Sequence, residues 1–331
     1  MYQKRMRTEV SGPLMSFTPG VCRREAGRLA CSDRIGGGLE FVVGLIVYTG
    51  RGMRSGSGPN GHMEQKIERR LGFIGCGNMG GAMIRGIADS GIVGRDQIFI
   101  YDVNETVREE MCALGVQVMD KNEAVCMASD MIFLAVKPQY MAETLASTNG
   151  ALEGRCVVSI AAGLSAARIR ELAGVNVRVL RTMPNTPAMV GLGAFALCSD
   201  CDLSSEEREA ADVLFSALGI VEWVPEHLMD AVCGVSGSGP AYAAMFLEAM
   251  ADGGVREGLP RSTAYRLAAQ TMLGTAQMYL QNGTHPGVMK DLVTSPAGTT
   301  IEGCYALEKG GMRAAVMDAV HAGAEKSRRM G

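Results

Sequence analysis

The stretch Leu71-Gly72-Phe73-Ile74-Gly75-Cys76-Gly77-Asn78-Met79-Gly80 decides the fold of this 331-residue chain. Its first four residues form an apolar run of strand length, and the glycines at 75, 77 and 80 form a G-x-G-x-x-G motif. Apolar residues at helical spacing follow, at Met79, Met83, Ile84 and Ile87. A strand, a glycine turn and a helix in this order are typical of a dinucleotide-binding βα unit.

Each glycine of the motif has its own physical reason. Gly75 permits the tight turn, Gly77 lets the backbone approach a pyrophosphate, and Gly80 lets the helix pack against the strand. Free N–H groups at the helix N-terminus suit the phosphate. The alternative is an ordinary glycine-rich turn, and the flanking strand and helix favour the nucleotide site.

The composition limits the classes of partner and compartment. The chain is 47% hydrophobic with a formal net charge of −3, which disfavours nucleic acid or an anionic membrane as the main partner. Its length suits about two domains. Ten cysteines lie scattered, as in a reducing cytosol, and the longest early apolar run, 41–48, is far shorter than the about 20 residues of a spanning helix. These features predict a cytoplasmic protein.

Residues 1–62 differ from the rest of the chain. They are rich in glycine and serine with scattered arginines, and no periodicity persists. Three interpretations compete: a stretch upstream of a misplaced start, a remnant of an expression vector, or a transit peptide. We expect a disordered N-terminal extension without function, because Met63 precedes the first strand as a natural start would.

Residues 71–182 alternate between short apolar runs and helical segments, which predicts a doubly wound, mainly parallel Rossmann sheet. Ligands bind such sheets beyond the carboxyl ends of the strands. The loops at 137–138, 161–163 and 183–187 are therefore expected to face a ligand. Strands are expected at 71–74, 97–101, 116–118, 131–136, 156–160, 177–180, 193–198 and 220–224.

The sequence changes character near residue 226. Long helices rich in alanine, methionine and leucine are expected at 240–253, 261–281, 286–293 and 299–329. Their faces are more apolar than one short helical domain can bury, which predicts an interlocked homodimer. We therefore expect a Rossmann domain over 67–226 and an all-α dimerisation and substrate domain over 227–331.

Asp102 follows the second strand, 22 residues after Gly80. That spacing fits the acidic residue that binds a ribose 2′-hydroxyl, which favours NAD over NADP. The alternative is a strand-end aspartate that caps a turn.

Two glycine-containing stretches in the helical region are further candidate sites. In 234–242, small residues precede Pro240, which suits the first turn of a helix. In 295–301, a loop opens a helix whose free N–H groups suit a carboxylate, although Thr299 or Thr300 could be a plain helix cap. Tyr242 and Tyr265 are expected in the core.

Common catalytic sets are missing from the sequence. There is no Ser-His-Asp set and no phosphate-binding G-x-x-x-x-G-K-[ST], and Cys198 and Cys201 have no second ligand pair for a metal. The chain has only four histidines. Reduction of a protonated C=N bond tolerates this scarcity, because positioning and a cofactor carry most of that chemistry.

Seven segments together resemble the pyrroline-5-carboxylate reductase family. The likeness covers 67–329 and none of 1–62. It implies reduction of 1-pyrroline-5-carboxylate to L-proline by NADPH or NADH, the last step of proline biosynthesis, in a homodimer that often assembles into a decamer. The segments are Leu71–Gly80, Ala135–Pro138, Ser159–Gly163, Arg181–Ala188, Gly234–Tyr242, Ala251–Pro260 and His285–Ile301.

The resemblance also implies the site residues. Thr300 would bond the ring nitrogen of the substrate, with backbone amides nearby for its carboxylate. The implied substrate contacts are Glu226, Gly298, Thr299 and Thr300. The implied cofactor contacts, besides Asp102, are Gly75, Cys76, Gly77, Asn78, Met79, Gly80, Asn122, Ala135, Val136, Lys137, Pro138, Ala161, Ala162 and Gly163.

One position departs from the family pattern. Relatives often have serine or threonine where this chain has Asp102, with asparagine or arginine nearby for the 2′-phosphate of NADP. Because Asp102 would repel that phosphate, we expect NADH to be used at least comparably with NADPH.

Two other functions fit parts of the sequence. A β-hydroxyacid or 6-phosphogluconate-type dehydrogenase would need a lysine base, for which Lys290 is the candidate. A non-catalytic dinucleotide sensor would not need a second, carboxylate-ready helix terminus. Activity on the six-membered cyclic imine remains open.

Overall fold

The computed structural model describes residues 24–25, 28–29 and 67–330. The chain divides into two compact units, Met1–Gly61 and His62–Gly331. In the first unit, Arg24–Glu25 (β1) and Arg28–Leu29 (β2) pair antiparallel. The expectation of a disordered extension over 1–62 otherwise concerns residues outside those described.

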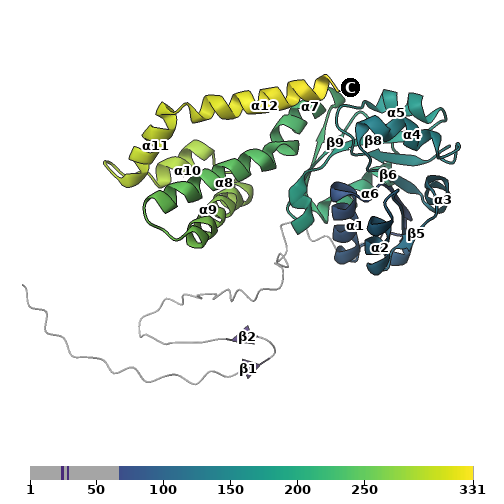
Figure 1. The fold of residues 1–331 in the computed structure, drawn as a ribbon, viewed down its shortest axis with the longest axis horizontal. Helices are drawn as coiled ribbons and strands as arrows, with labels where there is room; N and C mark the ends of the chain where they lie inside the picture. The colour runs from purple at the N-terminus through teal and green to yellow at the C-terminus, as the bar shows by residue number, and fades with distance from the viewer. Residues whose placement is uncertain (1–23, 26–27, 30–66, 331) are drawn as a thin grey trace, which may run out of the picture. The chain divides into compact units, whose positions relative to one another are not determined.

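The second unit contains an eight-stranded sheet in the order β10-β9-β8-β7-β6-β3-β4-β5 (Figure 1). Neighbouring strands are parallel except for the pair β8–β9. The order reverses between β3 and β6, as in a doubly wound Rossmann fold, so the predicted fold class is confirmed. The strands are Leu71–Ile74 (β3), Ile98–Tyr101 (β4), Gln117–Val118 (β5), Met131–Leu134 (β6), Cys156–Ser159 (β7), Arg178–Met183 (β8), Gly193–Cys198 (β9) and Gly219–Val224 (β10).

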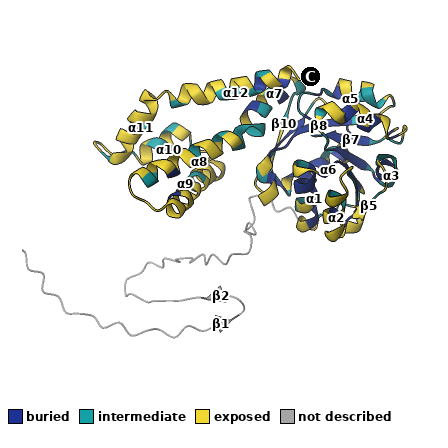
Figure 2. Cartoon of the chain, in the orientation of Figure 1, coloured by how far each residue is buried: buried dark blue, intermediate teal, exposed yellow. Residues whose placement is uncertain are grey.

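Helices cover both faces of this sheet, which explains the unbroken apolar runs of its inner strands. In β3, Phe73 belongs to one hydrophobic cluster and Ile74 to another. The Phe73 and Phe133 rings stack with centroids 4.4 Å apart, and Figure 2 shows the buried strands between the helices. The covering helices are Asn78–Ser90 (α1), Glu105–Ala113 (α2), Asn122–Ala128 (α3), Met141–Ala146 (α4), Ala166–Ala173 (α5) and Ser205–Ser216 (α6).

The region after the sheet is helical, as predicted, although several boundaries differ; the expected helix 240–253 continues to Arg256. Helix begins at Met229 instead of 240 and passes through a π-helical turn, and the expected helix 299–329 is two helices. Gly311 has φ 71°, which a continuous right-handed helix cannot accommodate. The elements are Met229–Val232 (α7), Cys233–Gly237 (η5, the π-helical turn), Gly239–Arg256 (α8), Arg261–Asn282 (α9), Pro286–Leu292 (α10), Thr299–Lys309 (α11) and Met312–Arg328 (α12).

Much of the apolar surface of these helices faces outward. In α9 the buried residues are Ala264 and Ala268, and every residue of α10 and α11 is at least partly exposed (Figure 2). Leu292 is 73% exposed and Met317 is 71% exposed. Apolar surface on this scale marks an interaction face.

The last helix returns to the sheet domain. A side chain at Gly234 in η5 would collide with the Val320 carbonyl of α12, so glycine permits their close approach. The Tyr242 hydroxyl donates to the Ala319 carbonyl at 3.0 Å, which gives that tyrosine a structural role. Within residues 67–330, no helix has the combination of length and apolarity that a bilayer crossing requires.

Candidate cofactor and substrate sites

The loop after β3 contains two glycines that the fold itself requires and one, Gly77, that has open space around it. Gly75 has φ 92°, and a Cβ there would lie 2.7 Å from the Ala135 carbonyl oxygen. A Cβ at Gly80 would collide with the Gly75 carbonyl and lie 2.9 Å from the Ala135 Cβ. At Gly77, by contrast, a Cβ would meet no described atom within 4 Å. The fold therefore leaves open space beside position 77, into which a ligand could approach the backbone.

The N-terminus of α1 is open to an anion. Its N-cap is Gly77, no described side chain caps it, and its first turn carries no acidic residue. The N–H groups of that turn and the helix dipole therefore favour a negatively charged group.

Asp102 lies against the glycine loop. Its Oδ2 accepts a hydrogen bond from the Cys76 N–H at 2.7 Å, and its Oδ1 accepts one from the Asn104 N–H at 2.9 Å. The carboxylate thus braces the loop and caps the turn after β4. Both roles leave its negative charge beside the expected ribose.

Arg108 is a neighbour that the sequence did not single out. Its Nη1 donates to the Asp102 carbonyl at 2.7 Å, and its guanidinium lies 5.7 Å from the centroid of the Tyr101 ring. An arginine at the end of this strand can accommodate a 2′-phosphate. The only sequence signal was its place one helical turn into α2.

Cys76 is chemically inert in this loop. It is 2% exposed, and burial, followed by the Asp102 charge, raises the pKa of its thiol to about 12. The thiol stays protonated near neutral pH and has no nucleophilic role.

The next two expected cofactor segments follow β6 and begin α3. Ala135 donates its N–H to the Ile74 carbonyl at 2.9 Å, so 135–138 starts beside the glycine loop. Lys137 is exposed. Asn122 donates from Nδ2 to the Ser147 hydroxyl at 2.8 Å, and its buried Oδ1 has no partner among the described residues. A buried acceptor of this kind calls for a ligand or a water.

The loop 161–163 follows β7 and lies beside the start of the helical region. Ala162 packs against the cluster that contains Met183 and Met229. Glu226 reaches the same place, because its Oε1 accepts the Ala166 N–H at 2.8 Å. The structure therefore brings one expected substrate residue next to an expected cofactor loop.

Gly298, Thr299 and Thr300 form a second open helix terminus. Gly298 is the N-cap of α11, and no described side chain caps it, so neither threonine is a plain cap. Ala297 before it has φ 55°, which is unusual for a residue with a side chain. In Figure 1, α11 lies at the end of the helical region away from α1. Within one chain, α11 and α1 thus lie apart.

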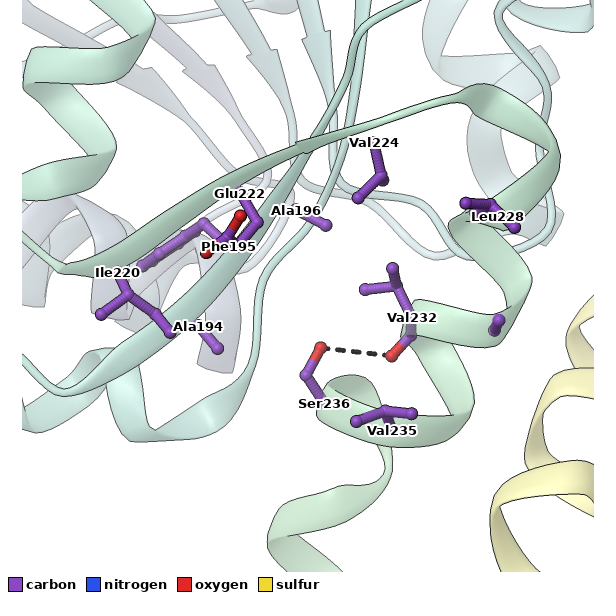
Figure 3. A pocket seen from close by; sticks show the side chains of 11 residues that line it. Ala194, Phe195, Ala196, Ile220, Glu222, Val224, Leu228, Val232, Val235 and Ser236 are labelled. Atoms are coloured by element: carbon purple, nitrogen blue, oxygen red, sulfur yellow. Dashed lines mark hydrogen bonds between the residues drawn. The ribbon is translucent and has the colours of Figure 1, made fainter. Parts of the chain in front are cut away.

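A separate apolar cavity lies between β9, β10 and the α7–η5 segment (Figure 3). Its volume is about 520 Å³, and Ile220, Val224 and Val235 are among its lining residues. The Ser236 hydroxyl in its wall donates a hydrogen bond to the Val232 carbonyl at 3.2 Å. None of the expected site residues lines this cavity.

Lys290 does not have the environment of a catalytic base. Its ammonium lies 2.6 Å from Asp291 Oδ1, and that hydrogen bond raises the pKa of the lysine. A base needs the opposite shift, so the hydroxyacid dehydrogenase alternative loses its candidate residue.

Two family models match the chain, one in the sheet domain and one in the helical region. Residues 70–163 match the NADP oxidoreductase, coenzyme F420-dependent family, and residues 226–330 match the pyrroline-5-carboxylate reductase dimerisation family. A pyrroline-5-carboxylate reductase of Methanosarcina acetivorans is 44% identical over 265 residues, which cover 80% of this chain and 98% of that protein. This chain belongs to the pyrroline-5-carboxylate reductase family.

Other members of the reductase family extend this result. The enzyme of Escherichia coli is 41% identical over 271 residues, covering 80% of this chain and 99% of its own length. The solved reductase of Plasmodium falciparum, with NADP bound, has a TM-score of 0.73 and 34% identity, covering 80% and 98% of the two chains. The residues around Gly77 fit such a cofactor through their open space, their uncapped helix and the Asn122 acceptor.

Proposed function

We propose that this chain reduces 1-pyrroline-5-carboxylate to L-proline, the last step of proline biosynthesis. Family membership over four-fifths of the chain and the open space at Gly77 carry the proposal. When bound, the reduced nicotinamide supplies the hydride. The chain positions the cofactor with the loops at 75–80, 135–138 and 161–163, with Asp102 and Asn122 at the adenosine end.

The substrate is held by charge and hydrogen bonding. The N–H groups of Gly298 and Thr299 at the open terminus of α11 suit its carboxylate. The Thr300 hydroxyl bonds the ring nitrogen and fixes the carbon that receives the hydride. Glu226 contacts the substrate from the side of the cofactor loop. Because a protonated imine already carries its proton, these groups need only bind and orient.

The complete site contains two protomers. Residues 67–226 bind the cofactor, and residues 227–331 carry the substrate terminus and the dimer contacts. The exposed apolar faces of α9 to α12 support an interlocked homodimer, in which α11 of one protomer serves the cofactor of its partner. The molar mass of the protein in solution tests whether the dimers assemble further into a decamer. The net charge of −3 disfavours a nucleic-acid or anionic-membrane partner, and the scattered cysteines support a cytoplasmic protein.

The activity is tested by mixing the chain with NADPH or NADH and 1-pyrroline-5-carboxylate and following the absorbance of the nicotinamide. We expect oxidation of the cofactor and formation of proline. Cofactor binding without oxidation would support the sensor instead. A parallel reaction with the six-membered cyclic imine measures how strongly the enzyme prefers the five-membered ring.

Shared sites predict complementation between two inactive variants. Gly77→Asp removes the cofactor site, and Thr300→Asp removes the substrate site by placing a negative charge beside the substrate carboxylate, so neither homodimer is active. Co-expression should restore about a quarter of wild-type activity, because half of a random mixture is heterodimer and each heterodimer keeps one intact site. A mixture no more active than its parents would place both parts in one protomer.

Removing the charge of Asp102 should change the choice of coenzyme. We expect Asp102→Ser to raise the NADPH-to-NADH ratio of kcat/KM roughly tenfold, because a negative charge beside the 2′-phosphate is lost. Asp102→Asn is the matched variant, since it keeps an acceptor for the Cys76 N–H. A strong wild-type preference for NADPH that neither variant changes would contradict the electrostatic role.

A further inference from the structure

Arg181 places a charged guanidinium in the interior at the end of β8. The residue is 4% exposed. Its Nη1 lies 3.7 Å from Glu226 Oε1, and its Nη2 lies 3.6 Å from Asp230 Oδ1. Nε and Nη2 have no hydrogen-bond partner within the described part of the chain. A buried charge is costly unless it is paired, so the two carboxylates are its compensation.

Each carboxylate is also tied to a different element. Glu226 Oε1 accepts the Ala166 N–H at the start of α5, directly after the loop 161–163. Asp230 Oδ1 accepts the Ser327 hydroxyl at 2.6 Å, near the end of α12. Arg181 therefore lies where the sheet, the cofactor loop and the last helix meet.

The pairing holds one oxygen of Glu226 and leaves the other available. Oε1 faces Arg181 and the Ala166 N–H, while Oε2 has no hydrogen bond among the described residues. The Glu226 side chain is 29% exposed, so a ligand can reach it. Without the guanidinium, two half-buried carboxylates would remain with no positive charge between them, and Glu226 would turn toward water.

We propose that Arg181 is a positioning residue that holds Glu226 in the orientation needed to contact the substrate. This inference rests on the proposed reduction of 1-pyrroline-5-carboxylate. Arg181 itself touches neither substrate nor cofactor. Its effect passes through Glu226, which makes the two residues energetically coupled.

Arg178 on the same strand provides a matched control. It also pairs with a buried carboxylate, that of Glu207, with Nη2 and Oε1 2.7 Å apart. Glu207 caps α6 through Ser204, and neither residue belongs to the expected cofactor or substrate contacts. Arg178→Met therefore removes a more exposed arginine–carboxylate pair of the same strand without disturbing Glu226.

The test compares steady-state constants and melting temperatures of the full chain. Arg181→Met should lower kcat/KM for 1-pyrroline-5-carboxylate roughly 10- to 100-fold, the cost of losing a group that orients a functional side chain, with the KM for NADPH within about twofold. Arg178→Met should lower the melting temperature and leave unchanged both kcat/KM for 1-pyrroline-5-carboxylate and the KM for NADPH. In a Glu226→Gln background, Arg181→Met should add little further loss, because coupled residues are not additive.

Three outcomes would overturn the inference. Arg181→Met could have the same kinetic constants as Arg178→Met, or the losses of Arg181→Met and Glu226→Gln could add fully in the double variant. The third is an equal rise of the KM for NADPH and the KM for 1-pyrroline-5-carboxylate in Arg181→Met. If Arg181→Met does not fold, Arg181→Lys replaces it, since one ammonium cannot span both carboxylates and should give a smaller loss of the same kind. Wild-type chain that binds NADPH but does not reduce the substrate would instead refute the proposed function.

Discussion

Gly77→Ala is expected to weaken NADPH binding roughly 100-fold, about 2.7 kcal/mol, while the chain keeps its stability. The added methyl group meets no described atom within 4 Å, so the folded protein accommodates it. Gly77 has φ −62°, outside the left-handed region that favours glycine. The methyl group instead occupies the space in which a pyrophosphate would approach the backbone. Fluorescence titration with NADPH and a thermal melt measure the two quantities.

Gly80→Ala is the matched comparison, because its methyl group would collide with the Gly75 carbonyl and crowd Ala135. We expect this variant to lose about 1–3 kcal/mol of stability, the usual cost of overpacking. The pair therefore separates a glycine needed by the ligand from one needed by the fold. Unweakened NADPH binding in folded Gly77→Ala would show that the loop does not hold the cofactor.

Thr300→Val is expected to lower kcat with little change in the affinity for NADPH. Valine keeps the shape of threonine and removes the hydroxyl that is proposed to bond the ring nitrogen. The loss of one such bond costs roughly 1–3 kcal/mol of transition-state stabilisation. Steady-state kinetics at saturating NADPH, together with a separate binding titration, give both values.

Thr294→Val controls for the loss of a nearby hydroxyl. Thr294 donates to the Lys290 carbonyl at 2.7 Å, a local bond at the end of α10. We expect that variant to keep the wild-type kcat. Wild-type turnover by Thr300→Val would clear Thr300 of a role in the reaction.

The sheet domain was predictable because its signals are local. Four-residue apolar runs such as Leu71–Ile74 in β3 and Met131–Leu134 in β6 show strands buried on both faces. Gly75 indicates a tight turn and Gly80 indicates a close contact between helix and strand, and any sequence with this βα unit needs both. The loops 135–138 and 161–163 could also be anticipated, since parallel strands present their carboxyl ends at one edge.

The helical region shows where local signals end. Helical residues continue through 233–237 because α12 packs against that turn, with Gly234 beside Val320, and no neighbour in sequence reveals this contact. The sequence does not reveal the break at Gly311, because glycine is tolerated within helices and takes a positive φ only in the folded context.

By itself, the sequence determined the fold class, the glycine loop and the residue types suited to a cofactor and a carboxylate. The tertiary structure decided how those residues are held: Asp102 braces Cys76, Arg108 stands beside Asp102, and Arg181 lies between Glu226 and Asp230. It also decided that α11 and α1 lie apart in one chain (Figure 1). The physical reason is that hydrogen bonding and charge pairing act between groups close in space, and all of these pairs except Arg108 and Asp102 are separated by tens of residues along the chain.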